Sequence, residues 1–162
     1  MKKLSILSFA LIIAFSSCGG QTRGSSPGFR DNGKRNSQAA APYIARGESH
    51  MKAKEYHSAV NDFTTAISYD NLSSTAYYNR AISFLLLNQF QRSIQDISWI
   101  IRASKEGRNA STLEEKKSIA GLYVLRGNIH LIIRQYNLAI TDFNHAIRLT
   151  PGNSMAYSFR SD

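Results

Sequence analysis

The feature that most constrains the fold of this chain is a short motif, Tyr-x-x-Arg followed by a small residue, which occurs four times. It reads YIARG at Tyr43–Gly47, YYNRA at Tyr77–Ala81, YVLRG at Tyr123–Gly127 and YSFRS at Tyr157–Ser161. Successive tyrosines are 34, 46 and 34 residues apart. A period of about 34 residues is typical of a unit made of two helices joined by a turn. The sequence therefore predicts stacked helix pairs.

Around the motif, three stretches align without gaps, at residues 40–73, 74–107 and 120–153. In each stretch the first helix carries a stripe spaced i, i+4, i+7, and the second helix carries a stripe that faces it. In the first stretch these stripes are Tyr43, Gly47 and His50, and Ala59, Phe63 and Ala66. The small residue lets the two helices approach closely. One pair cannot bury this surface alone, so neighbouring pairs must stack.

The stripes resemble the signature of the tetratricopeptide repeat family, which is an aromatic, a small residue four positions on, then Ala-x-x-x-Phe, a final Ala and Pro. The first unit matches through Tyr43, Gly47, Tyr56, Ala59, Phe63 and Ala66, and the third through Tyr123, Gly127, Tyr136, Ala139, Phe143, Ala146 and Pro151. The second matches less closely, through Tyr77, Ala81, Phe90, Ser93, Ile97 and Ile100. The resemblance implies an all-α, right-handed superhelical solenoid of antiparallel helix pairs. It covers residues 42–162, with about three units and a truncated fourth at 154–162.

Twelve residues, 108–119, separate the second and third units and account for the longer spacing between tyrosines. Within them, Ser111-Thr112-Leu113-Glu114-Glu115 has the pattern of a capping box at a helix start. We therefore expect the next helix to begin early, near Thr112. A disordered surface loop is the alternative.

Each of the three complete units places the arginine of its motif 16 residues before an aspartate of the second helix. The pairs are Arg46 with Asp62, Arg80 with Asp96 and Arg126 with Asp142. Antiparallel helices joined by a short turn bring such positions together, and a bidentate guanidinium–carboxylate pair suits the setting of helix register. We predict partly buried structural pairs. The alternative is a row of arginines that binds an acidic ligand.

The resemblance also implies a partner-binding surface, because the first helices of such solenoids line the concave face. By that resemblance the binding residues are Ile44, Met51, Tyr78, Ile82, Leu85, Leu86, Val124, Asn128, Leu131 and Ile132, with Glu48 and Lys52 beside them. This largely apolar set suggests a protein or peptide ligand with an apolar segment. Family members that clamp a terminal carboxylate use Lys and Asn, which occur here only at non-matching positions, so that mode is not expected. The alternative is that the chain covers this stripe itself.

The N-terminus predicts export and a membrane anchor. Residues 1–17 have a basic start, an apolar run and small residues, the layout of a secretory signal peptide, and the run is too short to span a bilayer. Cys18, the single cysteine, follows Phe15-Ser16-Ser17, which resembles the lipobox of bacterial lipoproteins. That resemblance implies lipidation of Cys18 and anchoring in the cell envelope, on the periplasmic side or in the outer membrane. Residues 18–41 predict a flexible linker. Plain secretion is the alternative.

The net charge of +9 does not point to nucleic acid. From Pro42 onward there are 14 Lys and Arg against 10 Asp and Glu, and no basic stripe is interleaved with aromatic residues. The sequence also lacks the motifs His-Glu-x-x-His and Gly-x-Ser-x-Gly and any cysteine pair. We therefore expect no enzyme, no metal site and no cofactor.

The expected function is a membrane-anchored, non-enzymatic protein–protein interaction module, an adaptor or assembly factor that uses the concave face of a short solenoid. The alternative is a structural subunit that self-associates through its uncapped C-terminal edge. The sequence leaves the oligomeric state open.

Overall fold

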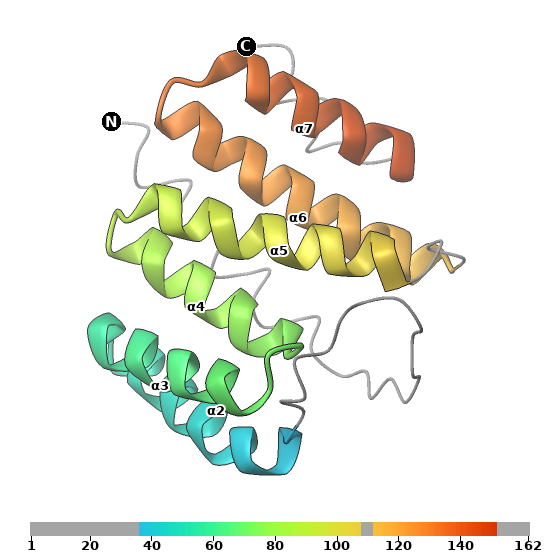
Figure 1. The fold of residues 1–162 in the computed structure, drawn as a ribbon. Coiled ribbons are helices and arrows are strands. Elements are labelled where there is room, and N and C mark those ends of the chain that lie inside the picture. The colour runs from blue at the N-terminus through green and yellow to red at the C-terminus, as the bar shows by residue number, and fades with distance from the viewer. Residues whose placement is uncertain (1–35, 108–111, 152–162) are drawn as a thin grey trace. The chain divides into compact units, whose positions relative to one another are not determined.

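The computed structural model describes residues 36–107 and 112–151, which form six α-helices (Figure 1). Their bounds are α2 Ser37–Lys52, α3 Tyr56–Tyr69, α4 Ser74–Leu86, α5 Phe90–Gly107, α6 Leu113–Ile132 and α7 Tyr136–Leu149. The prediction of an all-α fold made of helix pairs is confirmed. The predicted signal peptide, Cys18, most of the linker, residues 108–111 and the truncated fourth unit lie outside the described residues. None of the described helices is long and apolar enough to cross a membrane.

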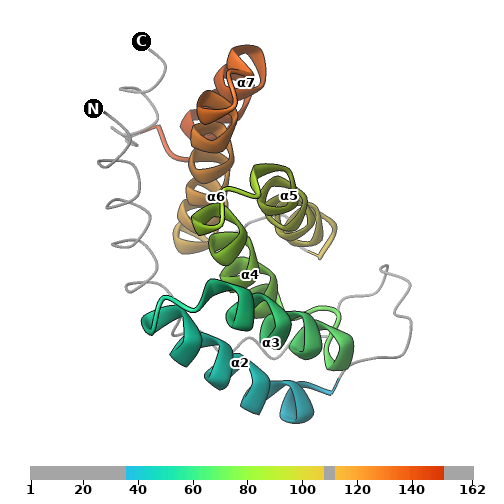
Figure 2. The same ribbon diagram turned by 90° about the vertical axis from the view of Figure 1, so that its left-hand side faces the viewer.

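The described residues divide into two compact units, 36–100 and 101–107 with 112–151. In the first unit α3 packs against both α2 and α4, and α2 also contacts α4 (Figure 2). The second unit contains the pair formed by α6 and α7. Neighbouring pairs of the first unit thus share an interior, as stacked helix pairs require.

The predicted early start of the helix after the second pair corresponds to α6. Its N-cap is Thr112, whose side chain accepts a hydrogen bond from the Glu115 backbone N–H at 3.2 Å. The Glu115 carboxylate accepts one from the Thr112 N–H at 3.3 Å, which completes the capping box. Residues 113–119 are therefore the first two turns of α6 and not a loop.

The linker prediction extends too far, because α2 begins at Ser37 and not after Ala41. The Asn36 side chain caps this helix by accepting from the Ala39 N–H at 3.0 Å. Ala40 is 1% exposed and packs in one cluster with Ala66 and Ala76. The composition of this segment resembles that of a linker, and it is helical because tertiary packing buries one of its faces.

All three helix pairs use the same turn. After α2, α4 and α6 one residue takes a positive φ, and these residues are Lys54, Asn88 and Arg134. The residue after each donates its N–H to the carbonyl five positions earlier, as Glu55 does to His50 at 2.9 Å. The left-handed residue itself donates to the carbonyl three positions earlier. This is the Schellman arrangement, and it directs each second helix back along the first.

A size rule governs the contact inside each pair. Gly47 and Gly127 face Phe63 and Phe143, and a Cβ on either glycine would lie 2.7 Å from the ring. In the middle pair the small position holds Ala81 and the large position holds Ile97. A larger residue on the first helix is thus matched by a less bulky one on the second, as close packing requires.

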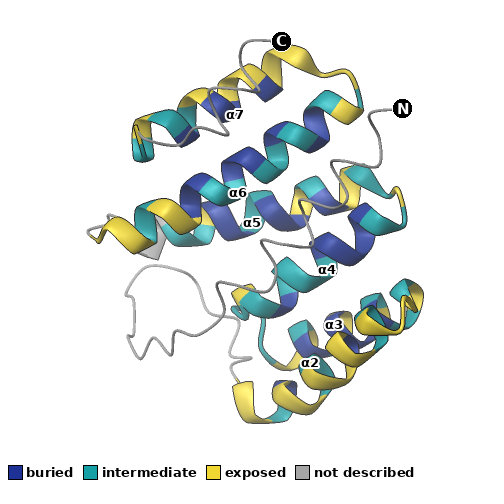
Figure 3. Ribbon diagram, turned by 180° about the vertical axis from the view of Figure 1, so that it is seen from behind, coloured by how far each residue is buried: buried dark blue, intermediate teal, exposed yellow. Residues whose placement is uncertain are grey.

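The middle pair also departs from the pattern by placing Ser93 where the other pairs have alanine. Ser93 is fully buried, and its hydroxyl donates to the Ala81 carbonyl at 2.8 Å. The polar atom is therefore satisfied inside the core. Burial differs between the first helices of the two pairs in the first unit. Figure 3 shows that α4 is largely buried, while α2 is exposed over much of its length.

Candidate functional site

The predicted arginine–aspartate pairs are present in all three helix pairs. Arg80 donates from Nε and Nη2 to the two carboxylate oxygens of Asp96, each at 2.8 Å. Arg126 binds Asp142 in the same bidentate way, at 2.9 and 2.6 Å. Arg46 donates from Nε and Nη2 to Asp62 at 2.5–3.0 Å. The three aspartates are buried. A dedicated partner for each guanidinium favours the structural role over the acidic-ligand alternative.

The tyrosine of each motif contacts both its arginine and the second helix. Each guanidinium lies over the ring three residues earlier, at 5.2 Å for Tyr43, 5.3 Å for Tyr77 and 5.5 Å for Tyr123. The tyrosine rings also stack on a second-helix ring, with Tyr77 on Trp99 and Tyr123 on His145. The Tyr-x-x-Arg motif is thus a packing device that joins the two helices of a pair.

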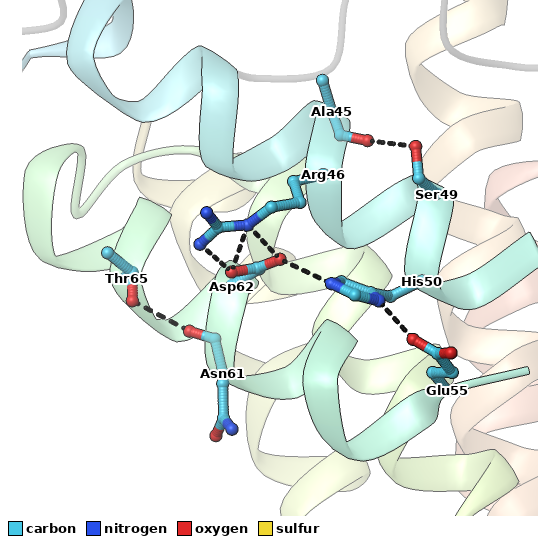
Figure 4. A network of polar contacts seen from close by, with 8 residues as sticks. All are labelled: Ala45, Arg46, Ser49, His50, Glu55, Asn61, Asp62 and Thr65. Carbon is cyan, nitrogen blue, oxygen red and sulfur yellow. Dashed lines mark hydrogen bonds and ion pairs between the residues drawn. The ribbon is translucent and has the colours of Figure 1, made fainter. Parts of the chain in front are cut away.

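Two histidines, one of them in the predicted packing stripe of the first unit, extend these pairs into hydrogen-bonded networks. His50 Nδ1 lies 2.6 Å from Glu55 Oε2, and its Nε2 lies 3.6 Å from Asp62 Oδ2 (Figure 4). His130 repeats this with Gln135 at 2.8 Å and Asp142 at 3.8 Å. Each histidine therefore spans the turn between its helices. The detectable signal is a histidine five residues before Glu or Gln.

The acid limb of stability provides a test of the first network. The hydrogen bonds from Arg46 hold the pKa of Asp62 below its ordinary value, against the opposing effect of burial and with a smaller contribution from His50. Ionised Asp62 then stabilises the fold above the unfolded-state pKa of about 3.9, and this stability is lost as pH falls through the lower folded value. We expect Asp62→Asn to flatten the pH dependence of urea unfolding below about pH 4. The prediction is contradicted if the free energy of unfolding falls equally steeply with decreasing pH in the variant and the wild type. Glu114→Gln, which changes an exposed acid, is the control.

The predicted partner-binding residues fall into two groups. Ile82, Leu85 and Val124 are 2%, 6% and 4% exposed and belong to the core. The remaining seven stay at least partly accessible; these are Ile44, Met51, Tyr78, Leu86, Asn128, Leu131 and Ile132. Ile44 also packs against the Ala40 cluster. The accessible surface is therefore smaller than the predicted set.

Polar atoms accompany these apolar side chains. Asn79 Nδ2 of α4 donates to Glu48 Oε1 of α2 at 3.2 Å, which links the first helices of two neighbouring pairs. The carboxamide oxygen of Asn128 is buried and accepts no hydrogen bond from the described residues. The described residues contain no group of three or more His, Cys, Asp or Glu able to hold a metal ion. The surface offers non-covalent contacts of mixed apolar and polar character.

Comparison with known proteins identifies the same repeat. A family profile described as tetratricopeptide repeat matches residues 120–153. The mitochondrial outer envelope protein 64 of Arabidopsis thaliana is 38% identical over 61 residues, which are 38% of this chain and 10% of that protein. The chain thus spans about a tenth of the length of this curated relative.

Two solved structures share the fold. The Arabidopsis OM64 TPR domain is 30% identical, with a TM-score of 0.62 over 76% of this chain and 93% of that one. The second TPR domain of human RPAP3, solved with the HSP70 peptide SGPTIEEVD, is 22% identical, with a TM-score of 0.60 over 78% of this chain and 96% of that one. The second likeness bears on the fold alone.

The profile, the OM64 domain and the three helix pairs agree with the resemblance drawn from the sequence. The shared domain is a non-catalytic interaction fold, which confirms the prediction that it is not an enzyme. The chain belongs to the tetratricopeptide repeat family.

Proposed function

We propose that this chain is a membrane-anchored, non-enzymatic interaction module, an adaptor or assembly factor that binds a peptide segment of another protein through the first helices of its pairs. The RPAP3 domain, which has the same fold, holds a peptide. The first helices here carry apolar side chains beyond those needed inside the pairs. A repeat domain with such a surface is suited to binding a helix or an extended segment.

The observation that carries this proposal is the accessible part of the predicted surface. In the first unit Met51 and Tyr78 are half-buried, and in the second Ile132 is 37% exposed. None of these side chains belongs to the arginine–aspartate pairs or to the glycine–phenylalanine contacts. Covering partly exposed apolar residues of this kind with a partner lowers the free energy of the complex.

The anchoring half of the proposal is supported by the N-terminal sequence. The single cysteine, Cys18, follows a basic start, an apolar run and small residues, and a lipid on it would hold the repeats at a bacterial envelope membrane. A tether raises the local concentration of the module at that membrane. The net positive charge of the chain before residue 42 would add a weak attraction to anionic headgroups.

The exposed face of α7 favours a second candidate, self-association through the C-terminal edge. Tyr136, Leu138 and Ile140 of this helix are 57%, 50% and 45% exposed. The equivalent residues of α3 in the first unit, Tyr56 and Val60, are half-buried, and α3 is packed against α4. A second copy of the chain would cover this face in the alternative.

One crosslinking experiment in the native envelope separates these functions. We expect Met51→Asp with Ile132→Asp to remove the crosslinked partners identified by mass spectrometry, because a buried charge at the interface is unfavourable. The matched control Ile140→Asp, at an exposed α7 position, should retain them. Loss of crosslinks with Ile140→Asp alone, together with a concentration-independent elution volume for that variant only, would instead establish self-association.

Cys18→Ser should abolish fatty-acid labelling and release the chain from membranes.

A further inference from the structure

The accessible face shared by α2 and α4 contains one carboxylate in a central position. Ile44 lies one turn before Glu48 on α2, and Met51 lies one turn after it. Glu48 is exposed, while Ile44 and Met51 are half-buried. Ile44 also packs on the Ala40 cluster, whereas the contacts that Gly47 and Arg46 make inside the pair do not involve Glu48 or Met51.

Glu48 is held in place by its neighbour on the next pair. The Asn79 amide donates to its Oε1 at 3.2 Å, and the described residues give Oε2 no hydrogen-bond partner. One oxygen is thus oriented by the protein while the other is left for a ligand. A carboxylate positioned before binding loses less side-chain entropy when a cation pairs with it.

The two arginines of the same helices are engaged elsewhere. Arg46 and Arg80, which flank the face on α2 and α4, are bound to the buried Asp62 and Asp96. Lys52 is exposed, one turn beyond Glu48 at the end of α2. An acidic ligand lying along the apolar strip would therefore meet Glu48 at its centre and find a cation only at the end.

We propose that the α2–α4 face selects peptides that carry a lysine or arginine between apolar residues, and that Glu48 is the specificity-determining residue. This inference rests on the proposed function. The apolar side chains of the peptide contact Ile44, Met51 and Tyr78, and its cation pairs with Glu48. A basic ligand of this kind is opposite in charge to SGPTIEEVD, the acidic peptide held by the RPAP3 domain.

The test uses the full chain purified in detergent and three labelled nonapeptide pools. All three pools have randomised Ile, Leu, Val, Met and Phe at the flanking positions, an amidated C-terminus and a single fixed central residue, which is Lys, Gln or Glu. Binding is measured by fluorescence anisotropy at low and at physiological salt. We expect the Lys pool to bind most tightly and the Glu pool most weakly, with the difference shrinking as salt is raised.

Two variants assign the preference to Glu48. Glu48→Gln keeps an acceptor for Asn79 and removes the charge, so it should weaken the Lys pool by about fivefold and leave the Gln pool unchanged. Glu48→Lys should reverse the ranking of the Lys and Glu pools. The control Glu114→Gln makes the same charge change at the exposed start of α6 and should alter nothing.

The outcomes separate this inference from the proposed function. Tightest binding of the Glu pool, or a preference for the Lys pool that survives Glu48→Gln, overturns the role of Glu48 while the module still binds peptides. Failure of all three pools to bind, with the helical circular dichroism of the chain intact, counts against peptide binding itself.

Discussion

Phe143→Ala is expected to lower the free energy of unfolding by about 3–5 kcal/mol. The ring is fully buried, and it occupies the space left by the missing side chain of Gly127. Removing it leaves a cavity between α6 and α7 that the surrounding structure can fill only in part. Urea denaturation followed by far-UV circular dichroism measures the loss. Leu138→Ala, on the same helix but half exposed, is the control and should change stability by less than about 0.5 kcal/mol.

The same contact predicts a change of sign. In the wild type, Gly127→Ala places a Cβ 2.7 Å from the Phe143 ring and should destabilise the fold by about 1–3 kcal/mol through overpacking. In the Phe143→Ala background the clash is gone, so alanine should stabilise α6 by up to about 1 kcal/mol, its ordinary advantage over glycine in a helix. An equal effect of Gly127→Ala in both backgrounds would show that the two residues are not coupled.

Much of this fold can be predicted from the sequence because its packing rules are local and repeated. Gly47 with Phe63 and Gly127 with Phe143 recur at the same separation, and so do the arginines with their aspartates. A spacing of 16 residues has one geometric solution when the chain turns back through a short left-handed turn. The capping box at Thr112 is likewise a purely local signal.

Features that depend on distant contacts are not predictable in this way. The segment before Pro42 resembles a linker, and it is helical because Ala40 packs with Ala66 and Ala76. Tyr43 stacks on Tyr69, four residues beyond the position used by Trp99 and His145 in the other pairs. In the first pair, the position on α3 that corresponds to Trp99 and His145 holds Thr65, which has no aromatic ring. The stacking ring, Tyr69, therefore comes from the next turn of α3.

The candidate site shows the same division. Helical spacing finds the residues of one face, but exposure depends on what surrounds each helix. Ile82 and Leu85 satisfy the spacing and are nevertheless buried, because α4 contacts both α2 and α3 and bonds to α5 through Ser93. The contact between Glu48 and Asn79 joins residues 31 positions apart and follows only from the stacking of two pairs.

Arg126→Met is expected to cost about 3–5 kcal/mol, because it leaves the Asp142 carboxylate without its partner where the side chain is only 4% exposed. Methionine preserves most of the apolar stem over Tyr123, so the loss reports the charge and not the packing. Hydrogen bonding to Asp142 raises the pKa of Arg126 above its ordinary value, so the guanidinium keeps its charge near neutral pH. Urea denaturation near neutral pH measures the loss.

The double variant Arg126→Met with Asp142→Leu should recover most of the stability, since an apolar pair of similar volume removes the unpaired charge. Arg46→Met is the matched control. It breaks the same kind of pair, but the Arg46 side chain is 60% exposed against 20% for Arg126, so water reaches the Asp62 carboxylate once the arginine is gone. Its cost should be clearly smaller. Equal losses at Arg46 and Arg126, or a double variant as unstable as Arg126→Met, would mean that desolvation of the aspartate does not set the energy of these pairs.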